Sequence, residues 1–224
     1  MNLLVVGAGT VGSSVIGIAV KAGHNITVIE ADQERAEACA ERHDVRVLHG
    51  DIADEAMEEE AGLAHADGIV ATTGDDSTNL MAMFLAREHG VRVLTSIVNY
   101  HSHGPLFEKL GARVLVDPEV LVAQHLFDLT MNPEAVDVTT LQHRGQVVEV
   151  TLGEGSRLTG KTVSEVRDEG LLGKRLFIVT VGRDDERFFP HPDTVLEAGD
   201  ELLVFSLTTI APADATLFTG EQAG

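Results

Sequence analysis

The stretch LLVVGAGTVGSSVIG, residues 3–17, runs from a short apolar segment into a glycine-rich turn and then into an apolar stretch with helical spacing. Gly7, Gly9 and Gly12 stand in G-x-G-x-x-G order. The first glycine permits a tight turn, the second lets the backbone approach a pyrophosphate, and the third lets helix and strand pack closely. The pattern predicts a strand, a phosphate-binding turn and a helix.

An acidic residue stands where a turn of this kind needs one. Glu30 ends the next apolar run, at about the 20-residue distance that the motif requires. Its carboxylate can accept both ribose hydroxyls of an adenosine moiety. The combination predicts a bound adenine nucleotide, and the alternative is a glycine turn that serves only the packing of strand and helix.

The chain around this motif alternates between two kinds of segment. Six runs rich in Val, Ile and Leu are typical of strands, and they begin at Asn2, Ile26, Val45, Gly68, Val91 and Ala112. The segments between them have a helical period: 11–22, 32–43, 54–62, 77–89 and 103–110. Near-continuous apolar strands separated by single helices predict an α/β fold, a Rossmann-like doubly wound parallel sheet over residues 1–117.

A different texture follows. We expect a linking helix and connector over 118–135, with a helix from about Glu119 to Met131 that Asn132 and Pro133 end. Strand-like runs, a hairpin at GRDDE (182–186) and a short helix with Thr162 as its N-cap predict a small α+β C-terminal domain over 136–220. The segment from about Ala211 has no periodicity, and we expect it to fray.

Charge is the unusual feature of the composition. The chain has 36 acidic and 16 basic residues, a formal net charge of −20, and only four lysines. Such self-repulsion is screened near molar salt, which favours a halophile's cytoplasm and predicts a thermal stability that rises with potassium chloride. The balance argues against a nucleic-acid partner. Cys39 is the single cysteine, and no apolar run approaches the ~20 residues that span a bilayer, so we expect a cytoplasmic protein without membrane insertion.

Further ligand contacts are expected at the carboxyl ends of the strands, beside the first strand. Asp51 either contacts the edge of the adenine ring or caps a helix. Asn99 either contacts the ligand or starts a turn. Asp32 is better explained as an N-cap. Arg35 could attract a 2′-phosphate, but Glu30 would repel it, which favours an unphosphorylated ribose. The full set of expected cofactor contacts is Gly7, Ala8, Gly9, Thr10, Val11, Gly12, Glu30, Ala31, Asp51, Ile52, Thr72, Thr73, Gly74, Asp75 and Asn99.

The sequence offers no catalytic constellation beside this predicted site. His101 and His103 lack a third ligand at a recognised metal-binding spacing, and His143 has no partner pattern for nucleophilic catalysis. We therefore expect a binding protein and no metal. A small NAD-dependent oxidoreductase, with a substrate pocket in the last 90 or so residues, is the alternative.

Several linked motifs resemble one family in particular. VVGAGTVG (5–12), VIEADQERAE (28–37), HGDIADEAMEEEAGLAHADGIVATTGDDSTNLMAMFLAREHG (49–90) and FEKLGARVLVDPEVLVAQHL (107–126) resemble the nucleotide-binding RCK or KTN domain of the Trk/Ktr potassium-uptake regulatory subunits. GSRLTGKTVSEV (155–166) and DTVLEAGDELLVF (193–205) are similar to the RCK C-terminal, or TrkA-C, module of the same family.

The resemblance implies roles for matching positions. The backbone of residues 7–12 would cradle phosphates, Glu30 would hold ribose, Asp51 would lie by adenine, and Thr72 and Thr73 would line the nucleotide. Many members carry arginines where this chain has Thr10 and Ile97. Their loss removes charge-assisted phosphate contacts and favours NAD, NADH, AMP or ADP over ATP.

The family is one of sensors and not of enzymes, so the resemblance implies a regulatory subunit on the inner face of the membrane that gates a potassium transporter or channel. The predicted helix carries Val120, Leu121, Val122, Leu126, Phe127 and Leu129. These side chains cover more surface than one sheet face can bury, which predicts a homo-oligomer, with dimers assembling into a ring. Burial by the C-terminal domain of the same chain, and a sensor for another cation transporter or antiporter, are the alternatives.

Overall fold

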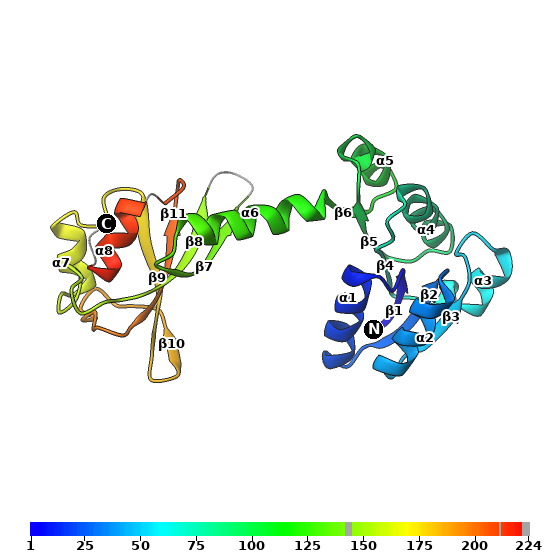
Figure 1. Ribbon diagram of the computed structural model, residues 1–224, viewed down its shortest axis with the longest axis horizontal. Helices are drawn as coiled ribbons and strands as arrows, with labels where there is room; N and C mark the ends of the chain where they lie inside the picture. The colour runs from blue at the N-terminus through cyan, green and yellow to red at the C-terminus, as the bar shows by residue number, and fades with distance from the viewer. Residues whose placement is uncertain (142–144, 211, 221–224) are drawn as a thin grey trace. The chain divides into compact units, whose positions relative to one another are not determined.

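The computed structural model describes residues 1–141, 145–210 and 212–220. His143 therefore lies outside the described residues. The chain divides into two compact units, Met1–Glu119 and Val120–Gly224, each with its own core (Figure 1).

The first unit is a six-stranded parallel sheet in the order β3-β2-β1-β4-β5-β6. Its strands are β1 (Asn2–Val6), β2 (Asn25–Glu30), β3 (Arg46–His49), β4 (Gly68–Ala71), β5 (Val93–Val98) and β6 (Arg113–Val116). The connecting helices are α1 (Thr10–Lys21), α2 (Gln33–Arg42), α3 (Glu55–Glu60), α4 (Asp76–Glu88) and α5 (Gly104–Lys109), with short 3₁₀ turns η1 (Leu63–His65) and η2 (His101–His103). The predicted Rossmann-like doubly wound sheet is confirmed.

Capping side chains set where two of these helices begin. Asp32 accepts a hydrogen bond from the Arg35 amide at 2.9 Å and starts α2, as the sequence predicts. Asp75 accepts from the Ser77 and Thr78 amides and starts α4. Both caps satisfy amides that have no partner inside the helix, and both lie at the edge of the sheet where the parallel strands end.

The second unit is an antiparallel five-stranded sheet in the order β10-β9-β11-β8-β7. Its strands are β7 (Ala135–Thr140), β8 (Gln146–Thr151), β9 (Leu176–Arg183), β10 (Glu186–Phe188) and β11 (Glu201–Ser206), and its helices are α6 (Pro118–Met131), α7 (Val163–Asp168) and α8 (Pro212–Thr219). Thr162 caps α7 in a reciprocal capping box with Glu165. The β9–β10 hairpin turns at Asp184 and Asp185, both with positive φ.

Two segments differ from the sequence expectations. The segment after Ala211, expected to fray, forms α8, because Phe218 is buried in the second core and the Gly153 amide bonds to the Phe218 carbonyl. The segment Ala135–Thr140, for which the sequence predicts the end of the connector at Ala135 and no strand, is β7 and pairs with β8. In both cases tertiary packing supplies the stability that the local pattern does not show.

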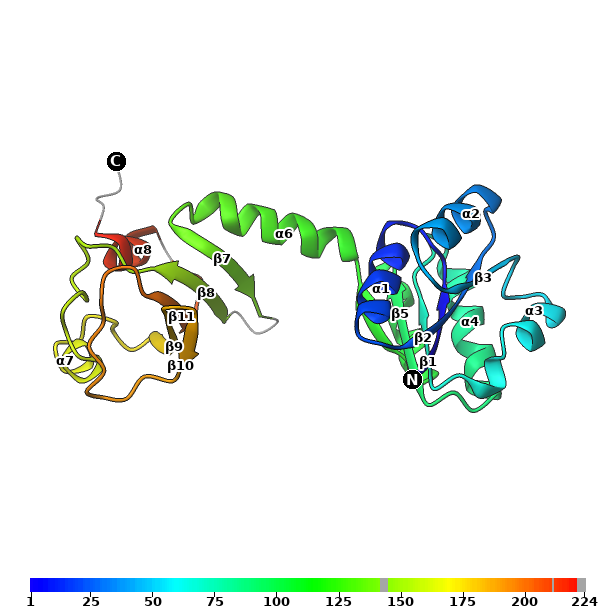
Figure 2. The same ribbon diagram turned by 90° about the horizontal axis from the view of Figure 1, so that it is seen from below.

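Helix α6 is packed against the second unit on one side. Asp128 is buried and accepts hydrogen bonds from Gln124 at 2.8 Å and Thr140 at 2.6 Å, while His125 bonds to the carbonyl of Val138. Figure 2 shows β7 beginning beside the C-terminal end of α6. Of the large apolar residues of α6, Leu129 packs on the second core, whereas six others are exposed: Val120, Leu121, Val122, Leu126, Phe127 and Met131. In the described part of the chain, no helix has the length and apolar character to cross a membrane.

Candidate functional site

The glycine turn joins β1 to α1, and the structure around each of its three glycines is different. Gly7 has a φ of +94°, which favours glycine. A Cβ on Gly12 would lie 2.0 Å from the Gly7 carbonyl oxygen, so helix and strand pack too closely for any side chain. A Cβ on Gly9 would meet nothing closer than Arg35, at 4.0 Å. The protein's own packing requires Gly7 and Gly12 but not Gly9, which is the N-cap of α1 and leaves open space beside its backbone.

Glu30 holds the turn from the end of β2. Its side chain is buried, and its two carboxylate oxygens accept hydrogen bonds from the Ala8 amide at 2.6 Å and the Asp32 amide at 2.9 Å. Each oxygen retains a further lone pair for a donor such as a ribose hydroxyl. Glu30 therefore shapes the glycine turn as well as offering acceptors beside it.

A cavity of about 340 Å³ opens next to the turn, at the carboxyl ends of β1, β2, β3 and β4. Its volume lies in the range of small-molecule sites. It brings together eight of the residues expected from the sequence: Gly7, Glu30, Ala31, Asp51, Ile52, Thr73, Gly74 and Asp75. Four more lining residues were not expected: Val6, Ile29, Gly50 and Thr78. The first three are strand ends or their neighbours, which the strand pattern could have indicated.

The two threonines after β4 have hydroxyls that already bond to the protein. The Thr72 Oγ1 is buried, 3.1 Å from the Val6 carbonyl and 3.0 Å from the Gly7 carbonyl, so it ties β4 to the glycine turn. The Thr73 amide and hydroxyl both donate to Asn79 Oδ1, at 3.0 and 2.7 Å. Thr72 thus bonds the end of β4 to the glycine turn, whereas Thr73 lines the cavity.

The two aspartates that line the cavity also have structural roles. Asp51 is exposed and accepts from the Ala53 amide at 2.9 Å, in a turn that precedes α3. The N-cap of α3 is Asp54, so Asp51 does not cap this helix, and its bond to Ala53 uses Oδ1 alone. Asp75 uses Oδ1 to cap α4. Both side chains can therefore present one oxygen to a ligand.

Asn99 is placed differently from the other expected contacts. It is not among the residues that line the cavity, and its side-chain amide donates to Asp76 Oδ1 at 2.8 Å and to the Thr73 carbonyl at 3.2 Å. Asp76 is buried and also accepts from the Asn99 and Tyr100 amides and from His103 Nδ1. Burial opposes ionisation, but the hydrogen bonds from Asn99, His103 and Tyr100 outweigh it and lower the pKa of Asp76.

Asp76 is a residue that the sequence reasoning missed. It links the cavity loop after β4 to the loop after β5, through Asn99. The sequence signal was the paired acid Asp75–Asp76 at a helix start, but only the fold shows that one caps the helix and the other points inward.

A second cavity, of about 400 Å³, lies on the other side of the glycine turn between α1 and α2. It is lined by Ala8, Gly9, Thr10, Ser13, Arg35, Ala38, Cys39 and Arg42. Thus Ala8, Gly9 and Thr10 face this cavity, while Val11 is partly exposed in the first turn of α1. Burial raises the pKa of the Cys39 thiol, as expected of a small side chain inside the fold.

The histidines near β5 form carboxylate pairs. His103 Nδ1 lies 2.7 Å from Asp76, and His101 Nδ1 lies 3.6 Å from Asp117. Across residues 1–141, 145–210 and 212–220, no cluster of three or more His, Cys, Asp or Glu side chains is arranged to hold a metal ion.

Parallel strand order, a glycine turn and an acid at the end of β2 define a Rossmann-type nucleotide-binding fold. Comparison with protein families gives the particular group. The TrkA-N domain model matches residues 3–118, and the TrkA-C domain model matches residues 147–207. The chain belongs to the TrkA family.

Two relatives align with this chain over nearly the whole length of both proteins. A Trk system potassium uptake protein TrkA of Mycobacterium tuberculosis strain H37Rv is 32% identical over 214 residues, covering 93% of this chain and 94% of that protein. A Trk system potassium uptake protein TrkA homolog of Methanothermobacter thermautotrophicus is 28% identical over 221 residues, covering 98% of this chain and 100% of that protein.

Solved structures show the same fold. The GsuK channel bound to NAD has a TM-score of 0.62 and 19% identity, covering 97% of this chain and 39% of the channel chain. The GsuK RCK domain has a TM-score of 0.62 and 19% identity, covering 99% of this chain and 48% of that one. This chain therefore spans less than half the length of each of these two GsuK chains.

Proposed function

We propose that this chain is a nucleotide-sensing regulatory subunit of a potassium-uptake system, and that NAD, NADH or an adenine nucleotide occupies the cavity beside the glycine turn. The single observation that carries the proposal is the cavity at the strand ends, where buried Glu30 and Gly7 of the glycine turn lie together with Asp51 and Thr73. The family relatives are named for Trk potassium uptake, and structures with this fold are described as bound to NAD and to ADP.

In this proposal adenosine lies in the cavity formed by the loops after β2, β3 and β4. Glu30 accepts the ribose hydroxyls, Asp51 meets the adenine edge, and the backbone of Thr73 and Gly74 adjoins the nucleotide. The phosphates lie against the backbone of Gly7, Ala8, Gly9, Thr10, Val11 and Gly12, where the first amides of α1 have no partner inside the helix. Ala31 and Ile52 complete the walls of the cavity.

Calorimetric titration of NADH, NAD, AMP, ADP and ATP tests the site. Glu30→Gln is expected to weaken NADH binding by about 1–3 kcal/mol, because it replaces a charged acceptor of ribose hydroxyls with a neutral amide. Glu34→Gln makes the same change of charge at an exposed position on α2 and is expected to leave the affinity unchanged. Equal affinities of the Glu30 variant and the unchanged chain would remove the site assignment.

We further propose that the chain acts as a homo-oligomer, with dimers assembling into a ring, on a membrane potassium transporter or channel. The exposed side chains of α6, Val120, Leu121, Val122, Leu126 and Phe127, support this proposal because packing within the second unit leaves them uncovered. Nucleotide acts as a switch if it binds one conformation of the oligomer more tightly than the other.

Light scattering and reconstituted potassium flux test this second step. At molar potassium chloride we expect a particle larger than one chain, and a flux that changes with the nucleotides that bind. Leu126→Glu, on the exposed face of α6, is expected to shift the particle toward a single chain without altering nucleotide affinity. A strict monomer, or a flux indifferent to every bound nucleotide, would favour a small NAD-dependent oxidoreductase, which turnover of NADH would reveal.

A further inference from the structure

The cavity between α1 and α2 is unusual in its charge. Its eight lining residues include two arginines, Arg35 and Arg42, and no aspartate or glutamate. In a chain of formal net charge −20, a cavity with positive side chains and no lining carboxylate is opposite in character to the protein around it. Such a surface is suited to an anion.

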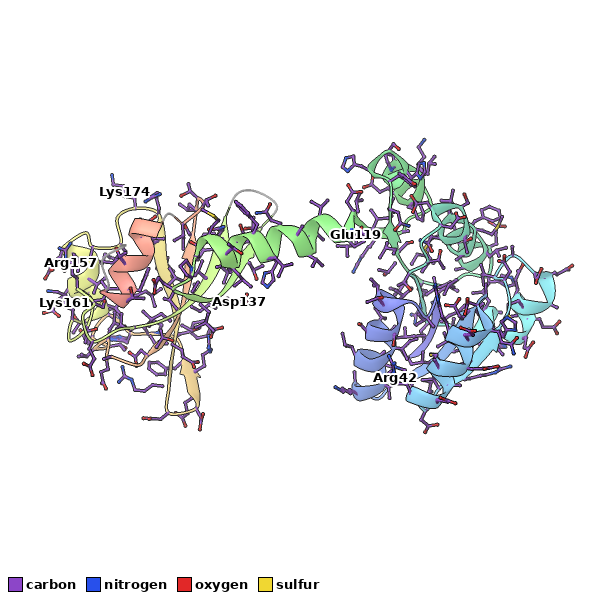
Figure 3. All side chains as sticks on the ribbon, viewed as in Figure 1. Arg42, Glu119, Asp137, Arg157, Lys161 and Lys174 are labelled. Atoms are coloured by element: carbon purple, nitrogen blue, oxygen red, sulfur yellow. The ribbon has the colours of Figure 1, made fainter. Side chains whose placement is uncertain are left out.

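The two guanidinium groups are available to a ligand. In the part of the chain that the structure describes, neither forms an ion pair with a carboxylate, whereas five other arginines do: Arg46, Arg92, Arg175, Arg183 and Arg187. Arg42 Nη1 makes a long contact of 3.4 Å with Ser13 Oγ, across the cavity from α2 to α1. Figure 3 shows Arg42 on α2.

Arg35 extends over the glycine turn. Its Nη1 lies 4.0 Å from the position that a Cβ on Gly9 would take. The turn separates the two cavities, because Gly7 lines the proposed adenosine site whereas Ala8 and Gly9 line the arginine cavity. A nucleotide that holds its ribose at Glu30 therefore has the arginine cavity within one residue of its phosphate-binding turn.

We propose that this arginine cavity is a phosphate subsite, in which Arg35 and Arg42 bind a terminal phosphate group of the nucleotide. The inference rests on the proposed nucleotide binding and gives it a specificity. A terminal phosphate carries close to two negative charges, which match two guanidinium groups, whereas each bridging phosphate of NAD carries one. The terminal phosphate is either the end of the 5′ chain, as in ADP, or the 2′-phosphate of NADP.

The 2′ alternative was disfavoured from the sequence because Glu30 would repel it. In the structure both Glu30 oxygens accept backbone amides, and the Ala8 and Asp32 amides compensate part of that charge. Repulsion from Glu30 therefore does not decide between a 5′-terminal phosphate and a 2′-phosphate, and affinity measurements are needed to distinguish them.

Two affinity ratios, measured by calorimetry at one fixed concentration of potassium chloride, test the subsite. The first compares ADP with AMP, and the second compares NADP with NAD. We expect Arg35→Gln and Arg42→Gln each to lower one ratio about tenfold, the amount expected for a lost charge-assisted hydrogen bond. Arg113→Gln removes an exposed arginine of β6 and is expected to leave both ratios unchanged.

The outcomes separate the possibilities. A fall in the ADP to AMP ratio assigns the subsite to the 5′ chain, and a fall in the NADP to NAD ratio assigns it to the 2′-phosphate. Arg42 also lies in the last turn of α2, where a cation stabilises the helix end. A role confined to the helix would lower the melting temperature and leave both ratios intact.

Unchanged ratios in both arginine variants, with AMP and NAD still bound, would overturn the subsite alone. Failure of the unmodified chain to bind any of the four nucleotides would overturn the proposed function, and the subsite with it.

Discussion

The two units bury polar side chains in different places. In the first unit Glu30, Thr72, Asp76 and Asn79 are all buried at one edge of the sheet, around the loops that follow β2, β4 and β5. In the second unit the buried polar residues are spread over α6, the sheet and its loops: Asp128, Asn132, Gln146, Ser156, Thr180, Asp200 and Ser206. Parallel strands all have their carboxyl ends on the same side of the sheet, whereas the carboxyl ends of neighbouring antiparallel strands lie on opposite sides.

This difference indicates the structural role of each set of polar groups. Those of the first unit hold loops around a cavity, as Thr72 does for the glycine turn. Those of the second unit join segments of the antiparallel domain to one another, as Gln146 does when it accepts from the Ile210 amide at 2.7 Å. Substitutions in the first unit are therefore expected to change ligand affinity, and those in the second unit to change stability alone.

The largest effect is expected from glycine substitutions in the turn. Gly12→Ala places a Cβ 2.0 Å from the Gly7 oxygen and 2.7 Å from Thr72 Oγ1, which we expect to destabilise the first unit by about 3 kcal/mol or more. Gly9→Ala meets open space and should leave the unfolding free energy almost unchanged while weakening nucleotide binding. Denaturant titration and calorimetry compare the two variants, and equal destabilisation would contradict the different reasons assigned to the two glycines.

Asp200→Ala is expected to have the next largest effect, in the second unit. Asp200 is buried and accepts from Arg183 Nε at 2.7 Å, from Arg183 Nη2 at 2.8 Å and from the Glu197 amide at 2.8 Å. Its hydrogen bonds and charge raise the pKa of Arg183. Removing the Asp200 carboxylate leaves the Glu197 amide and two guanidinium N–H groups without an acceptor, although Arg183 keeps its pair with Glu197, and we expect a cost of about 3 kcal/mol.

Nucleotide affinity serves as the internal control for Asp200→Ala. Denaturation should show the loss of stability, while calorimetry should show the affinity of the unmodified chain. A fall in affinity comparable to that of Glu30→Gln would break the separation between the two units.

Asp76→Asn is expected to have a smaller effect, and to change both the stability of the first unit and its affinity for nucleotide. The loss of charged hydrogen bonds to Asn99 and His103 should cost about 1–3 kcal/mol and weaken nucleotide binding, since Asn99 also holds the Thr73 carbonyl. Because the pKa of Asp76 is lowered in the folded state, its stabilising contribution is complete above the ordinary aspartate pKa of about 4. That contribution is lost as the pH falls through the lowered pKa.

Acid denaturation followed by circular dichroism checks this sign. The unmodified chain should lose stability more steeply than Asp76→Asn as the pH falls below about 4. Identical slopes would mean that Asp76 does not couple to protons in the folded state.

Much of the fold could be predicted from the sequence, because the first unit has strong local signals. Apolar runs of β1 to β6 alternate with capped helices, and such patterns depend on neighbours in the chain. Helix α8 could not be predicted, since PADATLFT has no apolar face and becomes helical through the burial of Phe218. Strand β7 likewise depends on its pairing with β8.

The candidate site was predictable to the extent that its residues follow strands. Glu30, Asp51 and Thr73 reach the cavity because parallel strands end at one edge. The use of Asn99 could not be predicted, because it depends on Asp76, which lies on another element and turns inward. The arginine cavity was missed for the same reason, since Ser13 and Arg42 meet only when α1 and α2 lie side by side.

The bond from the Ala8 amide to the Glu30 carboxylate makes the glycine turn visible to isotope labelling. An amide proton exchanges with deuterium only when its hydrogen bond opens, so the exchange rate of Ala8 reports how often the turn leaves Glu30. A neighbouring amide, that of Gly7, bonds instead to the Ile29 carbonyl within the sheet and supplies a reference that does not involve the carboxylate. The ratio of the two exchange rates reads the state of the turn in the unmodified chain, with no dye and no substitution.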